Sequence, residues 1–227
     1  MTEIEYLGYV LTREGIKPQP EKIRAILALL PPKNVKQVRS FLGMVQFYRD
    51  MWEKRSEILA PLMDLVGECG LTKATKKKGK KKPWHWDKIH QDAFDRVKQI
   101  MAKEILLAYP DYTQPFDIHT DASKRALGAI VSQNGRPIAF FYRKLTRAQE
   151  NYTTTERELL SIVEILKEFK GMLWGQRIRV HTDHINLIRD GLGKDCERVH
   201  RWRLLLEEYG PEFLYIKGEK RRSLLMQ

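Results

Sequence analysis

The sequence has only two cysteines and no long apolar run, and each shortage excludes a class of protein. Cys69 and Cys196 stand far apart in the chain and form no CxxC pair, so we interpret them as two reduced thiols. No apolar run approaches the roughly 20 residues of a membrane span. The first ten residues carry two glutamates and no basic segment, unlike a signal peptide. We therefore expect an intracellular protein, in the nucleus or a cytoplasmic particle, that is neither secreted nor bound to a membrane.

The charge of the chain is strongly unbalanced. Lys and Arg number 41 against 29 Asp and Glu, which gives a formal net charge of +12. Such an excess suits a polyanionic partner such as nucleic acid. However, residues 71–82 alone hold seven lysines and no acid. A run of this kind is typical of a solvated, disordered linker, although it also adds sequence-independent attraction to phosphates.

Apolar periodicity predicts different elements before and after this lysine run. Residues 3–18 alternate and turn at Arg13-Glu14-Gly15, which predicts a β-hairpin. Helices are predicted over 20–30, over 35–52 with Asn34 as N-cap, and from residue 56. A further helix is predicted over 86–104, with an apolar side formed by Ile89, Ala93, Val97 and Ile100.

The second half alternates short strands with helices. Strands are predicted over 116–121, 127–133 and 138–143, and Asn134-Gly135 joins the last two as a hairpin turn. A helix over 154–173, a strand over 178–183, helices near 184–190 and over 198–209, and a strand from 212 follow. This order predicts a mixed sheet with helices on its faces.

The tripeptide HTD closes two of these strands, ending at Asp121 and at Asp183. Alternation places Asp117, His119 and Asp121 on one face of the first strand. If the two strands are parallel neighbours, Asp121 and Asp183 lie side by side at the edge of the sheet. Two carboxylates there repel each other unless a divalent cation lies between them, so the pair predicts a metal site.

The residues alone leave alternatives open. Each aspartate could instead cap the segment that follows it. The helix over 154–173 offers Glu156 or Glu158 as a third ligand, on opposite flanks of its apolar stripe. Glu156 also forms a capping-box pattern with Thr153, and Glu158 forms the same pattern with Thr155. His181 and His184 are interpreted as partners of Asp183, because no cysteine or third histidine accompanies them.

Longer motifs carry a family resemblance. The stretches HTDAS, LGAIVSQ, RPIAFFYRKLT, NYTTTERELLSIV and HTDHINL resemble the RNase H domain of Ty3/gypsy-type long-terminal-repeat retrotransposon reverse transcriptases. The stretches YLGYVLTREGIKPQPEKIRAI, VRSFLGMVQFYRD and SEILAPLMDL resemble the end of the palm, the thumb and the connection of the same polyprotein. The resemblance covers nearly the whole chain.

The resemblance implies a fold and a division of the chain. The fold is α/β (α+β), an RNase H-like mixed five-stranded sheet with flanking helices, preceded by a β-hairpin and a small helical thumb and connection region. The implied parts are a palm-end and thumb-like region (1–70), a lysine-rich linker (71–82), a connection helix (83–110) and an RNase H-like domain (111–227).

The resemblance also implies chemistry. Asp121, Glu158 and Asp183 match the family's catalytic carboxylates, so the resemblance selects Glu158 over Glu156. The implied activity is hydrolysis of the RNA strand of an RNA–DNA hybrid with two Mg²⁺ or Mn²⁺ ions. As nucleic-acid contacts we expect Ser123, Asn186, Arg39 and Gln46.

Two departures from the family pattern weaken this expectation. The polymerase motif Tyr-x-Asp-Asp is absent, so we do not expect the chain to polymerise DNA by itself. The family's fourth carboxylate is expected at about Leu225, and leucine cannot bind Mg²⁺. One metal position is therefore expected to be weakened and cleavage to be slow. The alternative is an inactive retroelement fragment that only binds nucleic acid.

Overall fold

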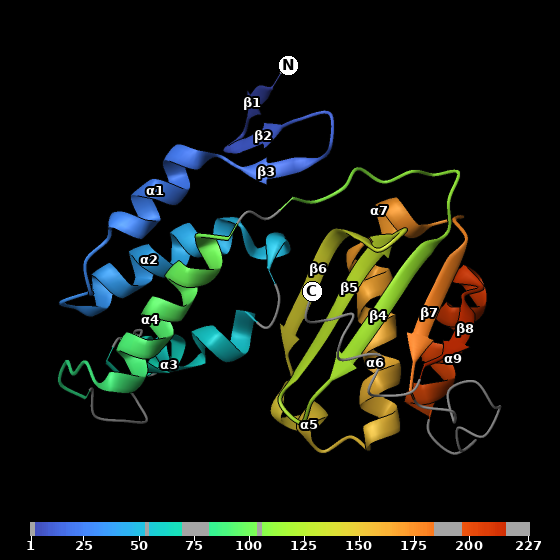
Figure 1. Cartoon of the computed structure of the whole chain (residues 1–227). Helices are drawn as coiled ribbons and strands as arrows, with labels where there is room; N and C mark the ends of the chain where they lie inside the picture. Colours follow the sequence, from blue (N-terminus) through green and yellow to red (C-terminus); the bar gives the residue numbers. More distant parts are fainter. Residues whose placement is uncertain (1–2, 53–54, 70–81, 104–105, 184–196, 217–227) are drawn as a thin grey trace. The chain divides into compact units, whose positions relative to one another are not determined.

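A computed structural model describes residues 3–52, 55–69, 82–103, 106–183 and 197–216, apart from the side chains of Ser56 and Asp121 (Figure 1). The chain forms two compact units, Met1–Leu106 and Leu107–Gln227. We call them the N-terminal unit and the C-terminal unit. The four-part division expected from the sequence stays a prediction.

A three-stranded antiparallel meander begins the N-terminal unit, with strands β1 (Ile4–Tyr6), β2 (Tyr9–Leu11) and β3 (Ile16–Pro18). The expected turn is present, because the Thr12 N–H donates to the Gly15 carbonyl over 2.9 Å. A single hairpin was nevertheless an incomplete prediction, since the chain turns a second time at Leu7 and Gly8, whose φ angles are 47° and 82°. A Cβ at Gly8 would lie 2.9 Å from the Phe47 ring, so glycine also permits this close approach.

The helices of this unit are α1 (Pro20–Ala28), α2 (Val35–Phe47), the 3₁₀ turn η1 (Arg49–Met51), α3 (Arg55–Cys69) and α4 (Lys88–Met101). Asn34 is the N-cap of α2 as predicted, accepting from the Gln37 N–H over 3.0 Å. The predicted apolar side of α4 was partly wrong, because Ile89 is 59% exposed. Phe94 is buried instead and contacts the Phe41 ring, with 4.6 Å between the centroids.

The C-terminal unit contains a mixed five-stranded sheet in the order β6-β5-β4-β7-β8. Its strands are β4 (Phe116–Ala122), β5 (Ala126–Gln133), β6 (Arg136–Lys144), β7 (Ile178–Thr182) and β8 (Glu212–Tyr215). Strands β4, β5 and β6 pair antiparallel, whereas β7 pairs parallel with both β4 and β8. The predicted Asn134-Gly135 turn is confirmed by φ angles of 52° and 75°.

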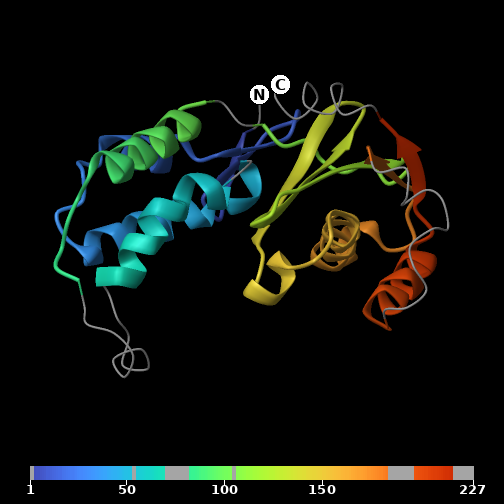
Figure 2. The same cartoon turned by 90° about the horizontal axis from the view of Figure 1, so that it is seen from below.

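The helices of this unit are α5 (Arg147–Glu150), α6 (Thr154–Glu168), α7 (Lys170–Leu173) and α9 (Glu197–Tyr209). The predicted helix over 154–173 is interrupted at Phe169, so α6 and α7 are separate. Figure 2 shows α6 (orange) and α9 (red) on one side of the sheet. The core lies between them and the sheet, and includes Phe116, Ile118, Ile178 and Val180. The predicted helix near 184–190 lies outside the described residues.

Candidate active site

Strands β4 and β7 bring the two HTD segments together. The strands are parallel neighbours, and each residue of β4 is level with the residue 62 positions later, from Phe116 with Ile178 to His119 with His181. The pairing ends at His119 and His181, and the same offset continued for two residues would make Asp121 level with Asp183. The condition set by the sequence, that these strands be parallel and adjacent, is therefore met. Asp121 is the next-to-last residue of β4 and pairs with Gly128 of β5, and Asp183 directly follows β7 and is half-buried.

The first two turns of α6 lie against the same end of the sheet. Ser161 is fully buried, and its hydroxyl donates to the Gly128 carbonyl over 3.3 Å. Gly128 is in turn the β5 partner of Asp121. Glu158 stands one helical turn before Ser161 and is only 2% exposed. Figure 1 shows that α6 begins at the end of the sheet where β4 and β7 finish.

Glu156 has a structural role that separates it from Glu158. Its carboxylate accepts from the Thr153 N–H over 2.8 Å and from the Thr153 hydroxyl over 3.0 Å, which completes the predicted capping box. It also accepts from Arg198 of α9 over 2.6 Å. Burial alone would raise the pKa of Glu156, but the hydrogen bonds from Thr153 and Arg198 outweigh it and lower the pKa. The Glu156 carboxylate therefore connects the start of α6 to the start of α9.

The described side chains contain no cluster of three or more His, Cys, Asp or Glu residues placed to hold a metal ion. That set does not include the side chain of Asp121. The geometry of the three predicted carboxylates thus stays a prediction. Their chemistry fits a hard divalent cation, because carboxylate oxygens are the ligands that Mg²⁺ and Mn²⁺ prefer.

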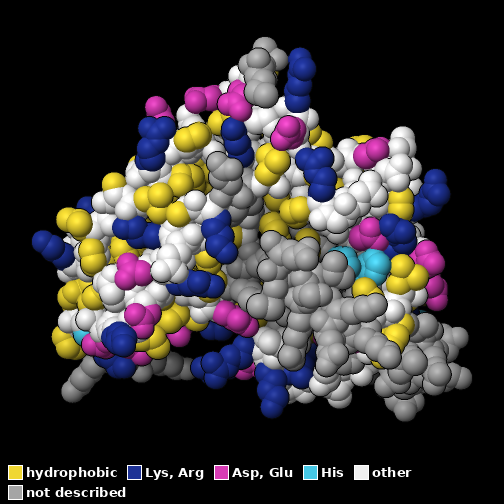
Figure 3. Space-filling view, viewed as in Figure 1, with side chains coloured by type: hydrophobic (Ala, Val, Ile, Leu, Met, Phe, Trp, Pro, Cys, Tyr) yellow, Lys and Arg dark blue, Asp and Glu magenta, His cyan; other side chains and the backbone are white. Residues whose placement is uncertain are grey.

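A polar cluster links β4 to β7 on the face of the sheet away from α6. The Asp117 carboxylate accepts from Arg179 over 2.8 Å and lies 2.7 Å from His181 Nε2. The rings of His119 and His181 stack with centroids 4.3 Å apart. Figure 3 shows histidine, acidic and basic side chains together on this unit. Burial would raise the pKa of Asp117, but the hydrogen bonds from His181 and Arg179 outweigh burial and lower the pKa.

This cluster corrects the interpretation of His181 as a partner of Asp183. His181 contacts Asp117 across the strand pair, because diagonal neighbours on one face of a sheet lie within reach of long side chains. His184 lies outside the described residues. The sequence placed Asp117 and His119 on one face but did not pair them with β7. Once β4 and β7 are known to be neighbours, matching their alternation is the signal that would have found the cluster.

The expected nucleic-acid contacts lie in both units. Arg39 and Gln46 are exposed on α2, seven residues apart and therefore on one helix face. Ser123 shapes the turn between β4 and β5, since its hydroxyl oxygen accepts from the Arg125 and Ala126 N–H groups. Asn186 lies outside the described residues. A role in binding nucleic acid stays a prediction for all four.

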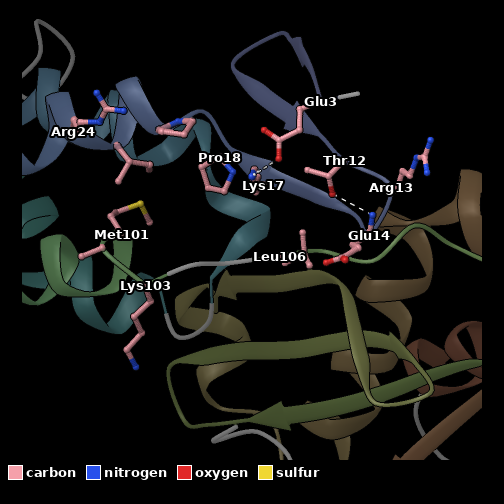
Figure 4. A pocket seen from close by; sticks show the side chains of 13 residues that line it. Glu3, Thr12, Arg13, Glu14, Lys17, Pro18, Arg24, Met101, Lys103 and Leu106 are labelled. Carbon is pink, nitrogen blue, oxygen red and sulfur yellow. Dashed lines mark hydrogen bonds and ion pairs between the residues drawn. The ribbon is translucent and has the colours of Figure 1, made fainter. Parts of the chain in front are cut away.

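The N-terminal unit holds a cavity of about 560 Å³ that includes none of the predicted carboxylates (Figure 4). Lys17 and Glu3 form an ion pair of 2.8 Å at its edge. Met101 and Leu106 contribute apolar surface, and Arg24 adds a cation. Its mixed lining does not indicate a particular ligand. Among the described residues, no helix is both long and apolar enough to cross a membrane.

Comparison with known proteins gives a consistent result. Residues 86–180 match the model of the RNase H-like domain found in reverse transcriptase. The retrovirus-related Pol polyprotein from transposon gypsy of Drosophila melanogaster is 37% identical over 221 residues, which cover 96% of this chain and 21% of that polyprotein. The transposon Tf2-3 polyprotein of Schizosaccharomyces pombe is 29% identical over 227 residues, covering 96% of this chain and 16% of that polyprotein. The chain thus spans about a fifth of the length of such relatives.

Solved structures agree in fold. The foamy viral protease-reverse transcriptase dRH in complex with double-stranded DNA matches 96% of this chain and 38% of its own, with a TM-score of 0.77 and 21% identity. The same viral enzyme in complex with an RNA/DNA hybrid matches 95% of this chain and 29% of its own, with a TM-score of 0.76 and 22% identity. These matches, the five-stranded mixed sheet and the sequence relatives lead to one assignment. The chain carries an RNase H-like reverse transcriptase domain, and its homologues are gypsy-type retrotransposon Pol polyproteins.

Proposed function

We propose that the C-terminal unit hydrolyses the RNA strand of RNA–DNA hybrids, with Asp121, Glu158 and Asp183 as the ligands of two divalent cations. The observation that carries the proposal is the parallel pairing of β4 with β7, whose register, if continued by two residues, would make Asp121 level with Asp183. The link from Ser161 to Gly128 adds the start of α6, and with it Glu158, at the same end of the sheet. Three carboxylates that meet there would repel one another unless a cation lies between them.

The roles of the chain's own groups follow from their chemistry. The three carboxylates would hold Mg²⁺ or Mn²⁺ through oxygen atoms, and no side chain has to attack the substrate. When bound, the cations activate a water molecule and stabilise the leaving oxygen. The rigid ends of β4, β7 and α6 would fix the ligand positions before the substrate arrives.

A nucleic-acid substrate is supported by charge and by relatives. The chain has a formal net charge of +12, which favours binding to phosphates. The foamy viral enzyme, which shares the fold, has been solved with an RNA/DNA hybrid. A hybrid also suits recognition by shape, because the ribose 2′-hydroxyls mark the RNA strand. We expect Arg39, Gln46, Ser123 and Asn186 to contribute contacts to it.

A second candidate is binding of nucleic acid without catalysis. It is favoured by Leu225, which stands where the resemblance implies a fourth carboxylate. Without that ligand one of the two cations would be held weakly, so cleavage would be slow even if the other three carboxylates converge. Mn²⁺ should then support more activity than Mg²⁺, because Mg²⁺ demands near-ideal octahedral coordination and loses its water molecules reluctantly.

The experiment is cleavage of an end-labelled RNA–DNA hybrid by the full chain in Mg²⁺ and in Mn²⁺. Asp121→Asn is the test variant. Asp92→Asn is the matched control, because Asp92 is exposed on α4 and the charge change is the same. Metal-dependent cleavage of the RNA strand that is lost in Asp121→Asn and kept in Asp92→Asn supports the proposal. Hybrid binding without cleavage in either metal supports the second candidate, and absence of both overturns the two together.

A further inference from the structure

The Asp117 carboxylate connects β4 to β7 a short distance before the two HTD aspartates. Its two oxygens contact different residues of β7, with Arg179 at 2.8 Å and His181 at 2.7 Å. Asp117 lies four residues before Asp121, and His181 lies two residues before Asp183. Within the described part of the chain, Asp117 is thus an acidic residue that connects β4 with β7, the two strands that lead to the predicted ligands.

Stability of the sheet does not require such a cluster. The side chain of Asp117 is only 14% exposed, and burial of a charge is unfavourable unless it is paired and hydrogen-bonded. Apolar residues of similar volume often replace a buried ion pair without loss of stability. The opposite face of the same two strands is already apolar, with Phe116, Ile118, Ile178 and Val180 in the core. A charged cluster here therefore calls for a reason other than burial.

The reason lies in the repulsion at the strand ends. When no cation is bound, Asp121 and Asp183 would place two negative charges at matching ends of the neighbouring strands β4 and β7, where they would repel each other. The contacts of Asp117 with Arg179 and His181 lie two to four residues before these aspartates and oppose separation of the strands at that end. The His119–His181 stack adds a second contact between β4 and β7 on the same face, with an angle of 10° between the rings. Ligands that are held in place bind a cation more tightly than ligands that must be ordered on binding.

We propose that Asp117 is a positioning residue, which holds the ends of β4 and β7 so that Asp121 and Asp183 are placed for divalent cations before these bind. The inference rests on the proposed function, because it concerns the same carboxylates. Asp117 itself would touch neither cation nor substrate. Its effect should therefore appear in the affinity for the cation and not in the rate once the cation is bound.

The test is titration of the full chain with Mn²⁺, with free Mn²⁺ followed by its electron paramagnetic resonance signal. Loss of an outer partner of a metal ligand typically weakens metal binding by about 10–100-fold. Asp117 acts at one remove, through the strands, so we expect Asp117→Asn to weaken binding by about 3–10-fold. Cleavage of the hybrid at saturating Mn²⁺ should stay within about twofold of the parent rate.

Glu164→Gln is the matched control. Glu164 forms a partly buried ion pair of 3.2 Å with Arg143, which joins α6 to β6 in the same unit. The charge change is the same, but neither residue lies on β4 or β7. Mn²⁺ affinity should be unchanged in this variant. Arg179→Gln removes the partner of Asp117 and should reproduce the Asp117→Asn effect if the latter variant folds poorly.

The outcomes separate this inference from the proposed function. Unchanged Mn²⁺ affinity in folded Asp117→Asn and Arg179→Gln overturns the positioning role, even if both variants are less stable. If the parent shows no Mn²⁺ binding that Asp121→Asn, Glu158→Gln or Asp183→Asn removes, the proposed function falls and the positioning role falls with it.

Discussion

Glu156 and Glu158, two residues apart on α6, are predicted to respond to substitution in opposite ways. Glu156→Ala should destabilise the start of α6 and leave cleavage of the hybrid largely intact. Glu158→Gln should abolish cleavage and leave α6 stable. The contrast arises because Glu156 is bonded to Thr153 and Arg198, whereas Glu158 is buried and is one of the proposed cation ligands.

The size of the Glu156 effect can be worked out from its contacts. Glu156→Ala removes the two hydrogen bonds that the Glu156 carboxylate accepts from Thr153, a loss of about 1 kcal/mol, but keeps the bond from the Glu156 N–H to the Thr153 hydroxyl oxygen. The ion pair with Arg198, whose side chains are 36% and 17% exposed, adds about 0.5–1 kcal/mol. The total of about 1.5–2 kcal/mol corresponds to an increase of about 13–30-fold in the amide exchange rate of the first turns of α6.

Hydrogen exchange followed by mass spectrometry measures the exchange rate of the α6 amides separately from the rest of the chain. For Glu158→Gln we expect a cleavage rate lower by about 100-fold or more, which is about 3 kcal/mol of transition-state stabilisation. The reasoning is refuted if Glu156→Ala abolishes cleavage while α6 keeps its protection. It is equally refuted if Glu158→Gln cleaves at the parent rate.

Three further predictions concern stability and binding. Because the pKa of Asp117 is lowered in the folded state, its stabilisation is complete above the unfolded value of about 3.9 and is lost as pH falls below it. The difference in unfolding free energy between the parent and Asp117→Asn, from urea denaturation, should thus shrink between about pH 5 and about pH 3; a constant difference contradicts this. Gly8→Ala should lower the free energy of unfolding by about 1–2 kcal/mol because of its positive φ angle, and by a further amount because of the clash with Phe47. Gly135→Ala should lower it only by the contribution of the positive φ angle, because no atom lies within 4 Å of its Cβ. Equal losses of amide protection in the two hairpins would disprove the clash. Arg39→Gln, made in the Asp121→Asn chain, should reduce the slope of log affinity for the hybrid against log salt by about one; an unchanged slope shows that Arg39 contacts no phosphate.

The sheet could be predicted from the sequence because its signals are local. Alternating residues and the Asn134-Gly135 turn define β4, β5 and β6, and these strands formed as expected. The turn at Leu7 and Gly8 was missed, because its reason is the approach of the hairpin to Phe47, almost 40 residues away. The apolar side of α4 was partly wrong for a similar reason. Packing against Phe41 selects Phe94, and periodicity alone cannot show which neighbour a helix will meet.

The candidate site shows the same division between local and distant information. Periodicity could not choose between Glu156 and Glu158, since both flank one apolar stripe. The structure separates them through Arg198, which lies 42 residues beyond Glu156 and reaches it across the α6–α9 contact. The Asp117 cluster also joins residues that are 62 and 64 positions apart. Such contacts depend on which strands and helices become neighbours. A single sequence does not show this, so the sequence could only state what would follow if β4 and β7 were adjacent.

Crystals of the full chain grown with Mn²⁺ would test the central claim most directly through anomalous scattering. The account predicts an anomalous peak among the carboxylate oxygens of Asp121, Glu158 and Asp183. The distance from the peak to these oxygens should be about 2.0–2.2 Å, as expected for a small divalent cation. A peak elsewhere, or three carboxylates that point apart with no metal between them, would contradict it.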